Sequence, residues 1–440
     1  MSTEVGSYYY FIKEGTAMSK TLVMTVGTGR TRTDIAQALL FSIRAHQPDR
    51  VVFLCSEVSR DQTLPEIRKE LTLPSEYVEV HTFAEENDVQ ILYQHYLSCL
   101  RRCDELIVDY TSGTKAMSAA LFAAGIALEA GEVSYITGPR DQTGRAVAST
   151  AIVAFPPELV LAERQLARAR ELFNGLDFHA CWQLARPLQK NLPKDSGLRR
   201  QAKTLGMLGN AYDLWDHFKW SESAHKLGKA SNPRENLVKV DLNRLEANAA
   251  FVREVDQNPY GDQRLVDLLN NASRRLQQGR FDDALARLYR AYEYLLQCRF
   301  HSQYGINTSD VALDKILKYP LSHSLANYLK KRAESKRGKL ELGLKDSLHV
   351  LAEMGDQLGL RLVELYWKSG TWQPGKKMIE QDAGPLQGWL NQRNASLMAH
   401  GTSPAHESTV TDMLAAYENL LREFIPNLDT LQQAAQLIKL

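Results

Sequence analysis

The stretch Thr21-Leu-Val-Met-Thr-Val-Gly-Thr-Gly29 decides the fold of the first third of the chain. Residues 21–26 are all apolar or β-branched, which predicts a strand buried on both faces. Gly27-Thr28-Gly29 then predicts a tight turn. A strand buried on both faces is typical of a parallel sheet covered by helices, so we expect an α/β domain.

The same pattern continues through the first 155 residues. Further strands are predicted at Arg50–Cys55, Tyr77–Phe83, Glu105–Tyr110, Glu132–Thr137 and Ala146–Phe155. Helices are predicted from a cap at Thr33 or Asp34 to His46, over Leu64–Leu71, from a cap at Asn87 or Asp88 to Arg102, and over the Ala-rich stretch to Ala130. The last two strands are expected to pair antiparallel around Gly138–Gly144. This alternation predicts a Rossmann-like, mostly parallel sheet covered by helices on both faces.

Two polar loops follow strands of this sheet, Gly27-Thr28-Gly29 and Thr111-Ser112-Gly113-Thr114-Lys115. Both belong to the edge where parallel sheets bind ligands, and the helix starts beside them attract anions. The dinucleotide fingerprint is excluded because Arg32 replaces its third Gly, and Ala116 after Lys115 excludes a P-loop. The residues alone leave two readings open, a phosphate-binding site and a pair of ordinary strand-to-helix turns.

Composition limits the classes of protein to consider. The 440 residues suggest two or three domains, and 44% hydrophobic with 24% charged residues is ordinary for a globular protein. The net charge of +1 argues against tight nonspecific duplex binding, although a local basic site for a short nucleic acid is compatible with it. No apolar run is long enough to cross a bilayer, and the N-terminus lacks the pattern of a secretory signal.

Five cysteines are scattered along the chain, which favours reduced thiols in a cytoplasm. Cys99 and Cys103 share a helix face, but no second pair completes a metal site. We therefore expect no bound metal.

From about Pro156 the strand pattern disappears. Helical segments begin at Phe178, Trp220 and Phe281, each an aromatic residue with a small residue three positions later. Their spacings of 42 and 61 residues are unequal and do not support a regular repeat array. Residues 156–270 are therefore expected to be an all-α connecting region that sets the distance between domains.

The last third contains a helix with an unusual stripe. A helix from Pro385 to Gly401 places Leu386, Leu390, Arg393, Leu397 and His400 on one face. Burial of an unpaired guanidinium and imidazole among leucines costs several kcal/mol (of the order of 3–5). Arg393 and His400 are therefore expected to face partners, an interface or a ligand, with Asn394 beside them.

These side chains suit RNA cleavage without a metal. The reaction needs a base for the ribose 2′-OH, an acid for the leaving 5′-oxygen and a cation for the phosphorane, and His and Arg supply these. One His does not readily fill both proton-transfer roles, whereas two copies across a dimer axis supply two. The spacing alone is weak evidence, and a structural role for Arg393 and His400 is the alternative.

Both motifs resemble those of a known family. Val26-Gly-Thr-Gly29 with Asp109-Tyr-Thr-Ser-Gly-Thr-Lys-Ala-Met-Ser118 resembles the CARF domain, over residues 18–155. Arg393-Asn-Ala-Ser-Leu-Met-Ala-His400 resembles the Arg-x(4–6)-His motif of HEPN ribonucleases, and Leu288–Leu296 resembles the first HEPN helix. This order of domains is that of CRISPR-associated ancillary ribonucleases. The resemblance implies a homodimer that binds cyclic oligoadenylate at its CARF loops and cleaves single-stranded RNA at a composite HEPN site, with Glu293 and Arg290 as supporting residues.

The resulting hypothesis has three domains: a CARF-like sensor over 18–155, the helical connection over 156–270 and an HEPN-like all-α ribonuclease over 271–440. Two alternatives stay open. The protein is then either a non-catalytic dimeric sensor that binds a partner, or a ring nuclease in which Thr28, Ser112 or Lys115 positions a 2′-OH for self-attack. A DNA-binding regulator is disfavoured because no basic recognition helix stands out.

Overall fold

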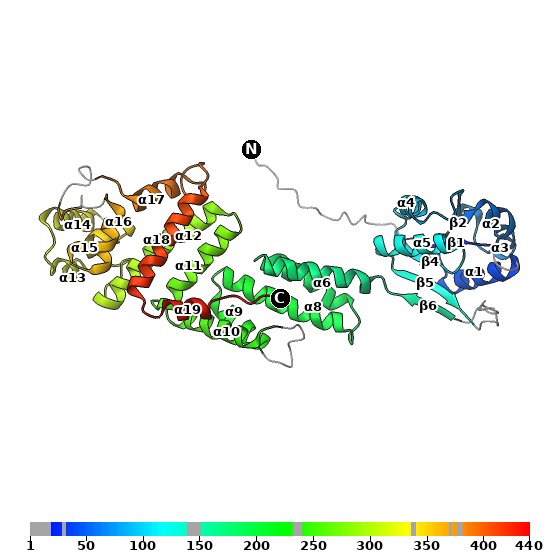
Figure 1. Ribbon diagram of the computed structural model, residues 1–440, viewed down its shortest axis with the longest axis horizontal. Coiled ribbons are helices and arrows are strands. Elements are labelled where there is room, and N and C mark those ends of the chain that lie inside the picture. The colour runs from blue at the N-terminus through cyan, green and yellow to red at the C-terminus, as the bar shows by residue number, and fades with distance from the viewer. Residues whose placement is uncertain are drawn as a thin grey trace. The chain divides into compact units, whose positions relative to one another are not determined.

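The computed structural model describes residues 19–28, 32–138, 151–231, 240–335, 340–368, 372–375 and 382–440. The chain divides into two compact units, Met1–Arg164 and Gln165–Leu440 (Figure 1). In the described ranges no helix combines the length and the apolar character that a bilayer span requires.

The first unit is built on a six-stranded sheet. Its strands are β1 (Lys20–Val26), β2 (Arg50–Ser56), β3 (Val78–Phe83), β4 (Glu105–Asp109), β5 (Glu132–Thr137) and β6 (Ala151–Phe155). They lie in the order β3-β2-β1-β4-β5-β6, and every pairing is parallel except that of β5 with β6. This is the Rossmann-like sheet that the apolar runs predict, including its antiparallel last pair.

Helices cover both faces of this sheet, and successive side chains along a strand pack into two different hydrophobic cores. The helices are α1 (Arg32–His46), α2 (Glu57–Gln62), α3 (Leu64–Glu70), α4 (Val89–Leu100) and α5 (Lys115–Ala127), with a 3₁₀ turn at Ser75–Tyr77. Leu22 and Met24 pack with α1 and α3, whereas Val23 packs with α4 and α5.

The helices of the first unit agree only in part with expectation. Helix α1 already begins at Arg32, so neither Thr33 nor Asp34 is its cap. Asp88 caps α4 as expected, accepting from the N–H groups of the two residues that follow Val89. The single helix expected near Leu64 is preceded by a second one, α2. Residues 139–150, which include most of the expected Gly138–Gly144 turn, lie outside the described residues.

The second unit is helical. Its helices, counting α6 at the boundary, are α6 (Glu158–Asn174), α7 (Phe178–Asn191), α8 (Gly197–Asp216), α9 (Trp220–Ala230), α10 (Leu242–Gln257), α11 (Asp262–Gln277), α12 (Phe281–Tyr304), α13 (Leu313–Leu317), α14 (His323–Ser335), α15 (Leu344–Glu353), α16 (Gln357–Tyr366), α17 (Pro385–Ala395), α18 (Glu407–Phe424) and α19 (Leu428–Ala434). Helix α12 packs against α11, α17 and α18, which brings the two ends of the C-terminal third together (Figure 1).

The three similar segments of the sequence start α7, α9 and α12. Each follows a turn in which one residue adopts a left-handed backbone: Leu176 (φ 66°), Phe218 (φ 61°) and Gly279 (φ 69°). In each turn the next N–H bonds a carbonyl five residues earlier at 2.9 Å, which closes the preceding helix. The shared pattern therefore marks one kind of helix-to-helix turn.

Candidate functional site

The two polar loops of the first unit meet where the strand order reverses. Strands β1 and β4 are neighbours whose connections leave in opposite directions, and ligands of such sheets bind at this point. A cavity of about 310 Å³ lies there, and its lining includes Gly27, Thr28, Thr111, Ser112, Gly113 and Thr114. Lys115 is exposed at the start of α5 but does not line this cavity. Gly29 lies outside the described residues.

Ser112 joins the two loops. Its Oγ accepts a hydrogen bond from the Gly27 N–H at 2.8 Å, and its carbonyl accepts one from the Thr25 hydroxyl. Gly113 has a left-handed backbone (φ 96°), which lets the β4 loop turn directly above β1. A Cβ on Gly27 would lie 2.7 Å from the Gly113 nitrogen, so this approach requires glycine.

The neighbouring threonines hold the loop as well. The Thr111 Oγ1 accepts from the Ile136 N–H at 2.8 Å, and the Thr114 Oγ1 caps α5 by accepting from the Met117 N–H at 3.2 Å. The hydroxyl of Thr28 is exposed at the rim. Among the described residues, Thr28 and Lys115 are therefore the polar side chains of these loops that stay free for a ligand, while the other hydroxyls shape the cavity.

Asp109, at the end of β4, fixes the start of the second loop. Its fully buried carboxylate accepts hydrogen bonds from the Thr111 N–H at 2.8 Å and from the Ser42 hydroxyl. Burial raises the pKa of this carboxyl above its usual range, and the two bonds oppose that rise. Asp109 therefore holds the second loop in place, which is a structural role for the aspartate of the Asp109–Ser118 motif.

Ser56 and Glu86 also line the cavity, and sequence reasoning missed both. Ser56 is the last residue of β2, so the rule that parallel strands end at one edge could have found it. Glu86 lies between the end of β3 at Phe83 and the start of α4, so the same rule could have found it as well.

In the second unit, the expected helix through His400 is wrong. Helix α17 ends at Ala395, and Ser396 has an extended backbone (φ −81°, ψ 163°). The Ser396 hydroxyl donates to the Arg393 carbonyl at 2.8 Å, which replaces the helical hydrogen bonding at this point. Leu386 and Leu390 are buried as the stripe predicts, but Leu397 is 75% exposed.

Arg393 lies on the last turn of α17 against α12. Its guanidinium carbon is 4.2 Å from the centroid of the Tyr289 ring, and its Nη1 donates to the Asn394 Oδ1 at 3.1 Å. The Arg393 Nε is buried and has no hydrogen-bond partner among the described residues. The guanidinium is thus positioned by an aromatic ring and an amide, and among the described residues it forms no ion pair.

His400 is brought back towards Arg393 by a main-chain turn. The His400 N–H donates to the Asn394 carbonyl at 3.3 Å, and the Gly401 N–H donates to the Ser396 carbonyl at 3.2 Å. The side chains of Asn394 and His400 are both exposed. The turn therefore brings the main chain of His400 back to that of Asn394, the residue after Arg393, and leaves the side chains of Asn394 and His400 on the surface.

Arg290 and Glu293, the expected supporting residues, form an ion pair with each other at 2.7 Å. Among the described residues neither has a hydrogen bond or ion pair with Arg393 or His400. Their common neighbour is Tyr289, whose pKa is raised by burial and by Glu293 and is lowered by Arg393 and Arg290.

Family models match most of the helical unit. Residues 253–423 match the Csm6 HEPN domain, and residues 161–257 match the Csm6 6H domain, so the two together span more than half of the chain. The chain belongs to the CARF–HEPN family of CRISPR-associated ancillary ribonucleases. Both members of the Arg393/His400 pair lie inside the matched HEPN region.

Relatives in the CARF–HEPN family cover nearly the whole chain. The CRISPR system endoribonuclease Csm6 of Thermus thermophilus is 26% identical over an alignment 439 residues long, which covers 93% of this chain and 84% of that protein. The structure of Enterococcus italicus Csm6 bound to cyclic hexa-2′-fluoro-hexa-dAMP has a TM-score of 0.57 and 16% identity, with coverage of 96% of this chain and 99% of that one. At that identity the likeness to the second protein is one of fold.

Proposed function

We propose that this protein is an endoribonuclease of CRISPR-linked antiviral defence that cyclic oligoadenylate activates and that cleaves single-stranded RNA without a metal. The observation that carries the proposal is the main-chain turn that brings His400 back to Asn394, the residue after Arg393, inside the matched HEPN region. Its cytoplasmic location and its three domains, 18–155, 156–270 and 271–440, stay predictions.

The proposed reaction uses the RNA's own 2′-OH. That oxygen attacks the adjacent phosphorus, the P–O5′ bond breaks, and the products are a 2′,3′-cyclic phosphate and a 5′-hydroxyl. One His400 takes the 2′-OH proton and a protonated His400 from the second copy donates a proton to the leaving oxygen. Arg393 stabilises the phosphorane, and Asn394 binds a phosphate oxygen. A homodimer with a two-fold axis supplies both imidazoles.

Activation is proposed to begin at the cavity between the β1 and β4 loops. Its polar rim, the exposed Lys115 and the start of α5 suit an anionic ring. Two such cavities on a two-fold axis match a ring with the same symmetry. The ring activates the HEPN site to the extent that it binds the active arrangement of the dimer more tightly than the inactive one.

The proposal is tested by adding cyclic oligoadenylates of different ring size to the purified protein with labelled single-stranded RNA and excess EDTA. We expect cleavage only with an activating ring, products ending in a 2′,3′-cyclic phosphate, and no cleavage of the matching DNA, which lacks the 2′-OH. Tight ring binding without any RNA cleavage would instead support the non-catalytic sensor, and linear products from the ring would support a ring nuclease.

Gly401→Ala is expected to lower the cleavage rate by about 10- to 100-fold, because a 1 Å displacement of a catalytic group costs of that order. A Cβ at this position would lie 2.0 Å from the Ala395 carbonyl oxygen, so the turn that carries His400 must open. The initial rate at saturating ring measures the effect. Gly388→Ala lies on α17, the helix before this turn, where the added Cβ would meet no atom within 4 Å outside the local helix backbone, and it is the control. Equal rates for the two variants would contradict the importance of this turn.

A further inference from the structure

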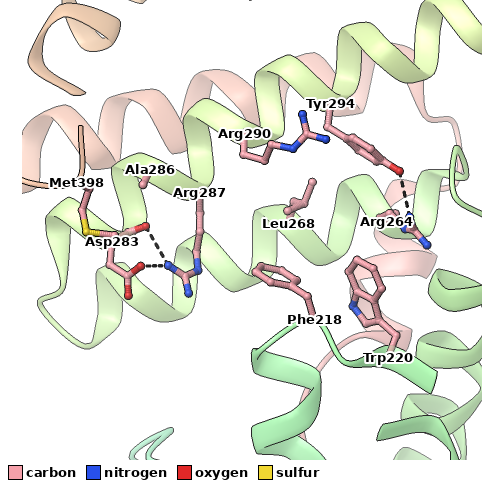
Figure 2. A pocket seen from close by; sticks show the side chains of 10 residues that line it. All are labelled: Phe218, Trp220, Arg264, Leu268, Asp283, Ala286, Arg287, Arg290, Tyr294 and Met398. Carbon is pink, nitrogen blue, oxygen red and sulfur yellow. Dashed lines mark hydrogen bonds and ion pairs between the residues drawn. The ribbon is translucent and has the colours of Figure 1, made fainter. Parts of the chain in front are cut away.

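The helical unit contains a pocket of about 520 Å³ beside the Arg393–His400 turn (Figure 2). Its walls come from the turn between α8 and α9, from α11 and from α12, and Met398 of the motif closes one end. The catalytic arrangement proposed above uses none of the groups that line it.

One side of the pocket is aromatic and rigid. The rings of Phe218 and Trp220 contact each other edge to face, with centroids 5.7 Å apart and an interplanar angle of 67°. The Trp220 indole N–H donates to the buried Asp267 carboxylate at 2.8 Å, and the Arg264 guanidinium lies 4.4 Å from the indole centroid. Both rings are half-buried, so each still has surface open to the pocket. Fixed, partly open rings of this kind provide the stacking surface that single-stranded nucleic acids use.

The other side carries an excess of positive charge. Arg287 and Arg290 line the pocket from α12, and Asp283, which bonds Arg287, is the one carboxylate among the described lining residues. Desolvation, followed by the nearby Arg275, Arg280 and Arg274, lowers the pKa of Arg287 to about 10. Arg287 is therefore repelled by the neighbouring arginines, and an anion bound in the pocket would weaken that repulsion.

Phe218 occupies a position that suits glycine. Its left-handed backbone (φ 61°) is one that glycine adopts without strain. Gly279 fills the corresponding position before α12, and Leu176 fills it before α7. The turn therefore accepts glycine as well as a large side chain, so the Phe218 ring can be removed without changing the backbone that the turn needs.

The pocket adjoins the proposed cleavage site through two residues. Met398 belongs to the Arg393–His400 turn, and Arg290 follows Tyr289, on whose ring Arg393 rests. We propose that the pocket binds a nucleotide of the substrate RNA next to the scissile phosphodiester, with its base against Phe218 and Trp220 and its phosphate on Arg287 and Arg290. This inference rests on the proposed ribonuclease function and adds a substrate subsite to it.

The test measures RNA binding separately from cleavage. Full-length protein carrying His400→Ala is titrated into a fluorescently labelled single-stranded RNA, and anisotropy gives the affinity. Phe218→Gly removes the ring while suiting the left-handed backbone, so this variant is expected to fold. Leu176→Gly makes the same change in the equivalent turn away from the pocket and is the matched control.

We expect Phe218→Gly to weaken RNA binding about tenfold, as the loss of one stacked base does, and Leu176→Gly to leave it unchanged. Arg290→Ala is expected to reduce the slope of log affinity against log salt by about 0.7, the value for one phosphate contact of a single strand. Affinities of Phe218→Gly and Leu176→Gly that cannot be distinguished overturn the proposal. A Phe218→Gly variant that loses dimerisation but keeps its RNA affinity also overturns the proposal, because the pocket would then bind a side chain of the second copy and not a nucleotide. The unsubstituted protein's cleavage of RNA tests the ribonuclease function independently of either result.

Discussion

His400→Ala is expected to lower ring-activated RNA cleavage by about a thousandfold, within the range that a general acid or base contributes. In the proposed dimer the substitution removes both the base for the 2′-OH and the acid for the 5′-oxygen. Ring binding is expected to stay unchanged, because the ring cavity lies in the first unit and His400 in the second. Single-turnover cleavage rates and calorimetric ring titrations measure the two quantities.

His406→Ala provides the control in the same connecting segment. His406 precedes α18, is exposed, and makes no side-chain capping bond to that helix. Its replacement is expected to leave the cleavage rate as it is in the unsubstituted protein. A His400→Ala protein that cleaves as fast as His406→Ala would refute the site assignment, and a His400→Ala protein that no longer binds the ring would indicate a folding defect.

Gly27→Ala is expected to weaken ring binding by about 10- to 100-fold, which corresponds to the 1–3 kcal/mol of an overpacked contact. The added Cβ would lie 2.7 Å from the nitrogen and 2.9 Å from the Cα of Gly113, and backbone atoms on both sides leave little room to relax. The two loops must separate, which also breaks the bond from Gly27 to Ser112. The ring concentration that gives half-maximal RNA cleavage should rise by the same factor.

Gly131→Ala is the matched change elsewhere in the first unit. Its Cβ would meet only the Leu106 carbonyl oxygen, at an ordinary 3.6 Å, so ring affinity should stay that of the unsubstituted protein. Thermal unfolding of both variants separates a local effect from a loss of the fold. A folded Gly27→Ala protein with unchanged ring affinity would remove the cavity from the proposed activation.

The sheet could be predicted from sequence because its strands are buried on both faces. Apolar runs such as Thr21–Val26 and Arg50–Cys55 leave no ambiguity of face, and the helices predicted between the strands then favour parallel pairing. The helix through His400 could not be predicted in the same way. A helical period continues in the sequence past Ser396, but the Ser396 hydroxyl bonds the Arg393 carbonyl and ends the helix there. A pattern of apolar residues does not indicate where a side-chain hydroxyl will compete with the helical hydrogen bonds of the backbone.

The candidate sites, too, could be predicted from the sequence only in part. The strand-end rule predicts the loops that line the cavity between β1 and β4, as the structure shows, while ring binding there stays a proposal. It does not predict that the hydroxyls of Thr111, Ser112 and Thr114 bond within the protein. The bonds of Thr111 and Ser112 depend on Ile136 and Gly27, which the fold alone brings near, whereas Thr114 makes a local helix cap with Met117.

The bonds that close the turn before Gly401 run between main-chain atoms, whereas Leu397 and Met398 turn their side chains outward. Many amino acids therefore fit an outward-facing position such as that of Leu397 without moving the guanidinium relative to the imidazole. Insertion of a residue, by contrast, shifts the register of the closing bonds. Ribonucleases with this loop should therefore tolerate many substitutions at outward-facing positions between the arginine and the histidine. For this reason the sequence motif is weak evidence until the structure shows the loop.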